Sequence, residues 1–344
     1  VIPAKLLVHL PALTFLFLTC GLFFTYIFSH MLILKPEGVF IGHPNAWGDW
    51  VVHISITNIF ANKPLDEWFL YHPFFAGGKL TYGFLVHLLT ALFMKLGASL
   101  PTAFFTISCV LLFSFLTGIY FFYYLLSNSK RAALLGIFLF FTSGGMGIFR
   151  FIKSLEISQI LHPTQDYSTF NQYQWLAGNI PAAMLIPQRA FFIGITLGIW
   201  ILVLLLIQTN KKKQQKLFMT AGVLAGILPI AHMHSFISIV VITGIFCAYH
   251  YKKWRQLAYF VIPATLLSCT LYLIFIANGI QVNNFMKISF GWTAPKTLFA
   301  WVFMWLQLWG FALPLVVLWA ARFISRYGLQ LGHRAFPAFV GFGV

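Results

Sequence analysis

Long apolar runs separated by short polar segments dominate the chain. A helix needs about 20 apolar residues to cross a bilayer, and the runs of that length are residues 6–34, 99–126, 132–152, 190–207, 257–277 and 298–321. The stretch 217–251 is too long for one crossing, because a helix rises about 1.5 Å per residue. We expect it to form a hairpin that turns near residues 232–235. The pattern predicts an all-α, polytopic membrane protein with about eight spans.

The charged residues give these spans an orientation. Only 8% of the residues are charged, and all six acidic residues precede residue 167. Short loops rich in Lys and Arg usually stay in the cytoplasm, so we place there the basic residues at 130–131, 211–213 and 252–255, and Arg322, Arg326 and Arg334. Residues 35–98, 153–188 and 278–296 then lie outside, and the first two of these loops hold every acid. Residues 80–97 are apolar but short, so we expect a helix that lies in the outer interface or dips back without crossing.

The overall composition agrees with a membrane protein. The net charge of +16 would favour nucleic acid in a soluble domain, but here the bases lie between apolar runs, so we expect membrane lipids and no nucleic acid as partners. The four cysteines fall within apolar runs, which argues against a disulfide framework. We treat residues 1–344 as a single transmembrane domain. Because an apolar stretch begins shortly before residue 344, we expect this domain to be a fragment of a larger protein.

The first outer loop holds the main candidates for chemistry. Asp49 and His53 share a helix face if Gly48 marks a helix start. There, Asp49 could accept a proton from a hydroxyl, or Asp49 and His53 could hold a divalent cation such as Mg²⁺ or Mn²⁺. The alternative is a helix cap beside an interfacial histidine. Asp66 and Glu67 form an acid pair, which either is solvated loop charge or binds a metal or an acceptor.

The second outer loop and the predicted hairpin turn supply further candidates. Arg189 opens an apolar span on the outer side, where it could bind a phosphate or anchor lipid headgroups. Amides, hydroxyls and aromatic rings suit carbohydrate as well as solvent, and we include Asp166 and Gln188 as possible substrate ligands. Lys153 could reach a phosphate too. The turn histidines, His232 and His234, either line a polar cavity or form an interfacial pair.

About the first 150 residues carry an ordered set of features. A first span is followed by the acid-bearing outer loop, a Pro- and Gly-rich stretch, a helix from Leu80-Thr81-Tyr82 to Lys95-Leu96-Gly97, a span ending at Lys130-Arg131, and a span closing on Thr142-Ser143-Gly144-Gly145. This order resembles the GT-C glycosyltransferases, which include protein O-mannosyltransferases, lipid A aminoarabinose transferases and many prokaryotic relatives. In that family an aspartate of the first outer loop is the presumed base or metal-linked acid. Asp49 is the matching position, although many members have Asp-Glu where this chain has Asp49-Trp50.

The resemblance implies a transferase on the outer face of a prokaryotic plasma membrane. Asp49 would deprotonate an acceptor hydroxyl on a protein, glycan or lipid, while Arg189 and Lys153 hold the phosphate of a polyprenyl-phosphate sugar donor. Two other classes stay open: a transporter or flippase for a lipid-linked or anionic solute, and a non-catalytic assembly subunit. The spans after residue 190 contain no acid, which weakens ion-coupled transport but not passive flipping.

Overall fold

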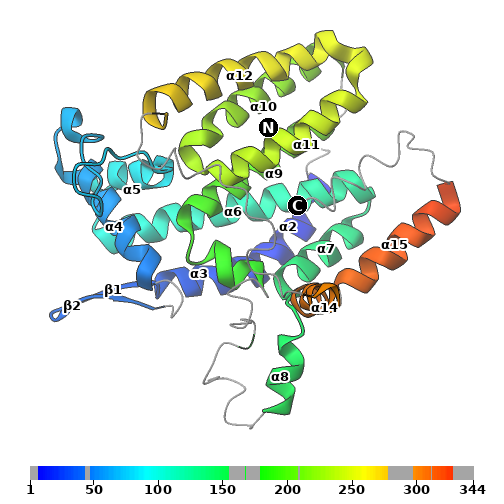
Figure 1. The fold of residues 1–344 in the computed structure, drawn as a ribbon, viewed down its shortest axis with the longest axis horizontal. Coiled ribbons are helices and arrows are strands. Elements are labelled where there is room, and N and C mark those ends of the chain that lie inside the picture. The colour runs from blue at the N-terminus through cyan, green and yellow to red at the C-terminus, as the bar shows by residue number, and fades with distance from the viewer. Residues whose placement is uncertain are drawn as a thin grey trace. The chain divides into compact units, whose positions relative to one another are not determined.

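A computed structural model of the chain describes residues 7–42, 47–154, 167, 179–207, 210–277, 297–310 and 312–327. These residues are mostly helical (Figure 1). Their contacts divide the chain, treated above as one domain, into two compact units. Unit 1 comprises Val1–Leu135, Ile186–Met286 and Phe336–Val344, and unit 2 comprises Gly136–Leu185 and Lys287–Ala335.

Four of the described helical segments are long and apolar enough to cross a membrane: Leu10–Ser29, Leu100–Ser127, Arg189–Leu206 and Tyr251–Phe275. The number is six if two pairs of bent helices each count as one span. The chain is therefore a helical membrane protein with four to six candidate spans, which is fewer than the eight predicted. Two of the missing spans are the helices of the stretch 217–251, which are either too short or too polar in their first turns. The number falls further, to four, if neither bent pair counts as one span.

Unit 1 begins with the first predicted span. It consists of α2 (Leu10–Leu16), the π-helical turn η1 (Phe17–Gly21) and α3 (Leu22–Ser29). The helix ends at Ser29, five residues earlier than the apolar run, because the chain turns there into a β-hairpin that the sequence analysis did not predict. Strand β1 (Leu32–Lys35) pairs antiparallel with β2 (Gly38–Ile41), and the register places Leu32 opposite Ile41.

The helices that surround the candidate site follow. They are α4 (Trp47–Asn62), the 3₁₀ turn η2 (Leu65–Glu67), α5 (Leu85–Lys95), α6 (Leu100–Ser127) and α9 (Arg189–Leu206). Helix α6 starts where the Ser99 side chain accepts a hydrogen bond from the Thr102 amide, and it ends at Asn128, whose φ of 53° is left-handed. Helices α4 and α5 pack through a core that includes Ile56, Phe60 and Phe84. The short helix α5 fits the predicted segment that does not cross the membrane.

The stretch 217–251 forms two helices, α10 (Lys211–Ala231) and α11 (Met233–Tyr249). The break falls at His232, whose extended backbone (φ −163°, ψ 113°) ends one helix and caps the next. The two helices contact each other, as in the predicted hairpin (Figure 1). The 3₁₀ turn η6 (Tyr251–Lys253) then leads into α12 (Trp254–Phe275).

Helices α10 and α12 make the most extensive helix contact in unit 1. Gly222 and Gly226 of α10 lie against α12, where a Cβ on Gly222 would collide with the Phe260 carbonyl oxygen. A Cβ on Gly226 would approach the Leu267 Cβ to 2.6 Å. Small residues four apart allow such close backbone approach between membrane helices. Because Gly222 contacts Phe260 and Gly226 contacts Leu267, the two helices run parallel.

In unit 2, two predicted straight spans are bent. Helix α7 (Lys130–Thr142), whose first residues belong to unit 1, is followed by α8 (Gly147–Lys153) after a bend of 63°. Helices α14 (Leu298–Trp309) and α15 (Ala312–Tyr327) meet at 98°. Glycines explain both bends: Gly310 has a positive φ of 52°, and a Cβ on Gly145 would collide with the Gln307 carbonyl oxygen. A π-helical turn, η5 (Pro181–Leu185), also belongs to this unit.

Candidate functional site

The start of α4 is joined to the start of α9. Asp49 lies in the first turn of α4 and is partly buried. The Nε2 amide of Gln188, which precedes α9, donates a hydrogen bond of 2.7 Å to Asp49 Oδ2. The sequence analysis proposed both residues separately, and the structure brings them into contact. Asp49 and His53 share a helix as expected from the position of Gly48.

The carbonyl oxygen of Pro187 also links the segment before α9 to α4. It accepts one hydrogen bond from Trp50 Nε1 over 3.1 Å and another from His53 Nε2 over 3.2 Å. Two side chains of α4 are therefore tied to a single backbone atom next to Gln188. This arrangement fixes where the Gln188 amide lies relative to Asp49.

A second histidine continues the network. His53 Nδ1 lies 2.8 Å from Nε2 of His87 on α5, and both rings are fully buried. Because Pro187 can only accept, His53 carries its hydrogen on Nε2, and the neutral ring then accepts from His87 Nε2 at Nδ1. This assignment leaves Nδ1 of His87 without a hydrogen, and no described residue donates a hydrogen bond to it.

Burial keeps both histidines neutral. It lowers the pKa of His53 to about 3, with a further contribution from the charge of Arg189. Burial also lowers the pKa of His87 well below its ordinary value, and His53 and Arg189 act in the same direction. The backbone of Phe84 and Gly83 opposes this shift only in part. The pair therefore acts as a structural link near neutral pH and not as a proton donor.

Arg189 lies beside this pair in the interior of unit 1. Its side chain is 3% exposed, and Nη2 donates to Thr90 Oγ1 over 2.8 Å. The guanidinium carbon lies 3.9 Å from the ring centre of Phe104 and 5.8 Å from that of Trp50. No carboxylate among the described residues pairs with it, and its Nε has no hydrogen-bond partner there. In this arrangement the guanidinium of Arg189 is buried inside unit 1 and does not reach its surface.

Asp49 lies in a different electrostatic environment. Partial burial raises the pKa of its carboxyl group, and the hydrogen bond from Gln188 limits the rise. Tyr82, which the sequence analysis mentioned only as part of a helix start, lies close enough for the Asp49 charge to raise its pKa, although burial is the larger cause. A carboxylate with a raised pKa is a stronger base than one in water.

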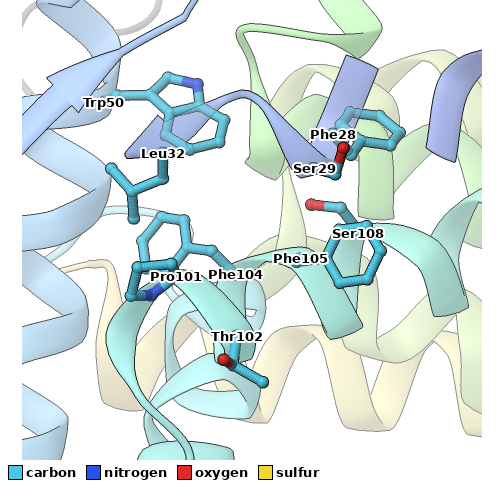
Figure 2. A pocket seen from close by; sticks show the side chains of 9 residues that line it. All are labelled: Phe28, Ser29, Leu32, Trp50, Pro101, Thr102, Phe104, Phe105 and Ser108. Carbon is cyan, nitrogen blue, oxygen red and sulfur yellow. The ribbon is translucent and has the colours of Figure 1, made fainter. Parts of the chain in front are cut away.

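A cavity of about 220 Å³ lies beside Trp50 (Figure 2). Helices α3, α4 and α6 and strand β1 supply its walls. The lining is mainly aromatic and aliphatic, with three hydroxyl groups, and consists of Phe28, Ser29, Leu32, Trp50, Pro101, Thr102, Phe104, Phe105 and Ser108. Trp50 and Phe104 belong to both this wall and the cage around Arg189, so the guanidinium lies behind the wall.

The arrangement of His53 bears on the metal hypothesis. Both of its ring nitrogens are engaged, one with His87 and one with Pro187, so neither is free to bind a cation with Asp49. Among the described residues there is also no group of three or more His, Cys, Asp or Glu side chains that could hold a metal ion. A cation at Asp49 would therefore be held without His53, by the carboxylate together with water and ligands that a substrate supplies.

The remaining candidates have surroundings of their own. Asp66 is exposed in η2, and Glu67 forms an ion pair of 3.3 Å with Lys63, which agrees with solvated loop charge. His232 accepts from the Ser235 amide and caps α11, while its ring edge meets Phe191. His234 is exposed, with its ring centre 5.4 Å from that of His232. Lys153 is exposed in unit 2, and Asp166 lies outside the described residues.

Several residues of the site were not singled out as site residues by the sequence analysis. His87, Pro187, Thr90 and Phe104 were not among the candidates. The polar residues His87 and Thr90 lie three apart in an otherwise apolar helix, which is the one sequence feature that indicates a buried polar contact. We refer to Asp49, Trp50, His53, His87, Pro187, Gln188 and Arg189 as the Asp49 cluster.

Comparison with known proteins identifies no relative. No family model, curated protein or solved structure matches this chain.

Proposed function

We propose that the chain is an integral-membrane glycosyltransferase that moves a sugar from a polyprenyl-phosphate-linked donor to an acceptor hydroxyl on the extracytoplasmic face. The observation that carries the proposal is the Asp49–Gln188 contact. A partly buried carboxylate, held in place by one amide and shifted toward a higher pKa, has the properties of a general base. Among the described residues no other acid is held in this way: Glu37 and Asp66 are exposed, and Glu67 is paired with Lys63.

In the proposed reaction Asp49 takes the proton of the acceptor hydroxyl. The acceptor oxygen attacks the anomeric carbon of the donor sugar, and the bond from that carbon to the phosphate oxygen breaks. The polyprenyl phosphate leaves with the electron pair, so the anomeric centre is inverted. Gln188 orients the carboxylate throughout, and the Pro187 contacts hold Gln188.

The cavity beside Trp50 supports a lipid-linked donor. Its aromatic and aliphatic walls suit an apolar chain, and the three hydroxyl groups can bind polar atoms near its end. Trp50 follows Asp49 directly in the chain, which keeps the cavity close to the proposed base. Arg189 has no carboxylate partner among the described residues and lies behind Trp50 and Phe104, so its charge favours an anionic phosphate in the cavity through space.

The proposal includes a GT-C-like fold and a site that faces outward from a prokaryotic plasma membrane. In this arrangement α10 and α11 are two short limbs of a hairpin, which brings the number of spans to eight. The acceptor is a protein, a glycan or a lipid.

The test uses the full chain in proteoliposomes with undecaprenyl-phosphate-linked radiolabelled mannose, glucose or aminoarabinose. The measurement is loss of label from the donor lipid into acceptors of added membranes. Asp49→Asn keeps the size of the side chain but removes the base, so transfer should fall on the order of 10²–10⁴-fold. Asp66→Asn and Glu67→Gln are matched controls and should transfer at close to the parent rate. Normal transfer by Asp49→Asn, with either control inactive, would show that Asp49 is not the base and that the carboxylate of the inactive control is needed instead.

One result would favour a different class. If the parent chain transfers none of these sugars but accelerates movement of the labelled lipid between leaflets, the chain is a carrier for lipid-linked solutes. The Asp49 cluster would then hold helices together and perform no chemistry.

A further inference from the structure

Two basic clusters, far apart in sequence, meet at one end of the α10–α12 pair. Gly222 of α10 lies against Pro263 and the Phe260 carbonyl of α12, which sets the register of the two parallel helices. Lys213 precedes Gly222 by nine residues, and Trp254 precedes Pro263 by nine. At about 1.5 Å per residue both lie about 14 Å before the same contact. The bases next to them therefore lie at the same level.

The side chains of this end are exposed. We refer to Lys212, Lys213, Lys216, Lys252, Lys253 and Arg255 as the basic surface, and all six are exposed. Two aromatic residues lie among them, because Tyr251 and Trp254 are each 64% exposed. Lys252 lies over the ring of Tyr251, and Arg255 lies over that of Trp254.

No acid balances this charge from the same part of the sequence. The chain has no Asp or Glu after residue 166, so α10, α11 and α12 carry none. In the described residues the one ion pair, Lys63–Glu67, uses a lysine from another segment. The surface thus keeps its full positive charge, which is unusual for helices that lie side by side.

We propose that the basic surface binds the headgroups of anionic phospholipids. Lysines beside a membrane attract anionic lipids, each by on the order of a fivefold gain in binding near the surface. Exposed Trp and Tyr side chains prefer the headgroup level of a bilayer, and here they lie among the bases. The α10–α12 helices that carry the surface include a candidate span, which places these side chains next to a bilayer and favours a lipid over a soluble acidic partner.

The experiment measures lipid selectivity of the full chain reconstituted in bilayers. Spin-labelled phosphatidylglycerol and phosphatidylcholine are compared by the fraction of each that is immobilised at the protein. The parent should prefer phosphatidylglycerol several-fold, and Lys212/Lys213/Lys252/Lys253→Gln should bring the ratio close to one. The matched control, Lys35/Lys63/Lys79/Lys95→Gln, removes four exposed lysines elsewhere and should retain the preference.

Two further measurements can also contradict the proposal. Lys212/Lys213/Lys252/Lys253→Arg preserves charge, so it should retain the preference even if the Gln variant is poorly folded. Inorganic phosphate at the same ionic strength as chloride should not lower the ratio more than chloride does, because the surface recognises a lipid in the bilayer and not a free anion. Equal selectivity in the Gln variant and the parent, or selective displacement by free phosphate, would overturn the proposal.

Discussion

Gln188 Nε2 and Asp49 Oδ2 are joined by a hydrogen bond of 2.7 Å, although 139 positions separate the two residues in the chain. The contact joins the first turn of α4 to the entrance of α9. Among the described residues it is also the interaction that lowers the pKa of Asp49 against the effect of burial. Removing it should therefore change the chemistry of Asp49 more than the stability of the protein.

The first prediction concerns this contact. Gln188→Met removes the amide donor, so the pKa of Asp49 should rise. Because the proposed base acts in its deprotonated form, transfer rises with pH through that pKa, and the acidic limb of the rate profile should move to higher pH. The measurement is the pH profile of sugar transfer. Gln215→Met, outside the cluster, is the control, and an unmoved limb in Gln188→Met would show that Gln188 does not tune the base.

The second prediction concerns the two buried histidines. The folded protein holds the pKa of His53 at about 3, whereas an unfolded histidine has a pKa of about 6.5. Between these two pKa values the unfolded chain binds a proton at His53 and the folded chain does not. The contribution to the free energy of unfolding is therefore fully present above about pH 6.5 and is lost as the pH falls. The thermal midpoint in detergent should drop between pH 7 and pH 4.5. His53→Gln with His87→Gln should flatten this slope, while His30→Gln at an exposed site should leave it unchanged.

The third prediction separates two roles of Arg189. A buried charge without a carboxylate partner costs folding free energy, and its replacement by an apolar residue is often neutral or stabilising. Arg189→Met should therefore unfold at or above the temperature of the parent. If its charge attracts the donor phosphate, the same variant should bind the polyprenyl-phosphate donor more weakly. Arg189→Met that binds donor like the parent would assign the residue a packing role alone.

The fourth prediction tests the contact between α10 and α12. A Cβ at Gly222 would collide with the backbone of α12, so Gly222→Ala should destabilise the protein by roughly 1–3 kcal/mol, as overpacking does. Gly244 on α11 has no atom within 4 Å of the same position, so Gly244→Ala should be tolerated. Thermal unfolding of both variants in detergent is the measurement. Equal midpoints would contradict the parallel register that places the two basic clusters together.

The fifth prediction concerns orientation. In a background without the four native cysteines, Asn62→Cys should react with an impermeant maleimide added outside intact cells. Asn128→Cys and Lys213→Cys should react only after the membrane is opened. All three positions are exposed, so access depends on the side of the membrane. Labelling of Asn62 and Asn128 from the same side would contradict the predicted topology.

Features that local sequence determines were predicted, whereas features that depend on contacts between distant segments were not. Spans such as α6 and α9 were predicted within two residues, because apolar length and local caps determine them. The bends at Gly145 and Gly310 were not, since each depends on close approach to a partner backbone. The hairpin at Leu32–Ile41 was also missed, because its first strand continues the preceding apolar run without a break. Asp49 and Gln188 were each recognised, but nothing local to either residue indicates that they meet.

The separation of those two residues also determines when the site can form. During synthesis the ribosome completes α4 long before α9, so the Asp49 carboxylate has no Gln188 to contact and no Pro187 carbonyl to fix its neighbours. A chain interrupted before residue 188 therefore holds the residue proposed to perform the chemistry without the surroundings that make it a base. Under the proposed function, the site is complete only once residues 187–189 have been added to the chain.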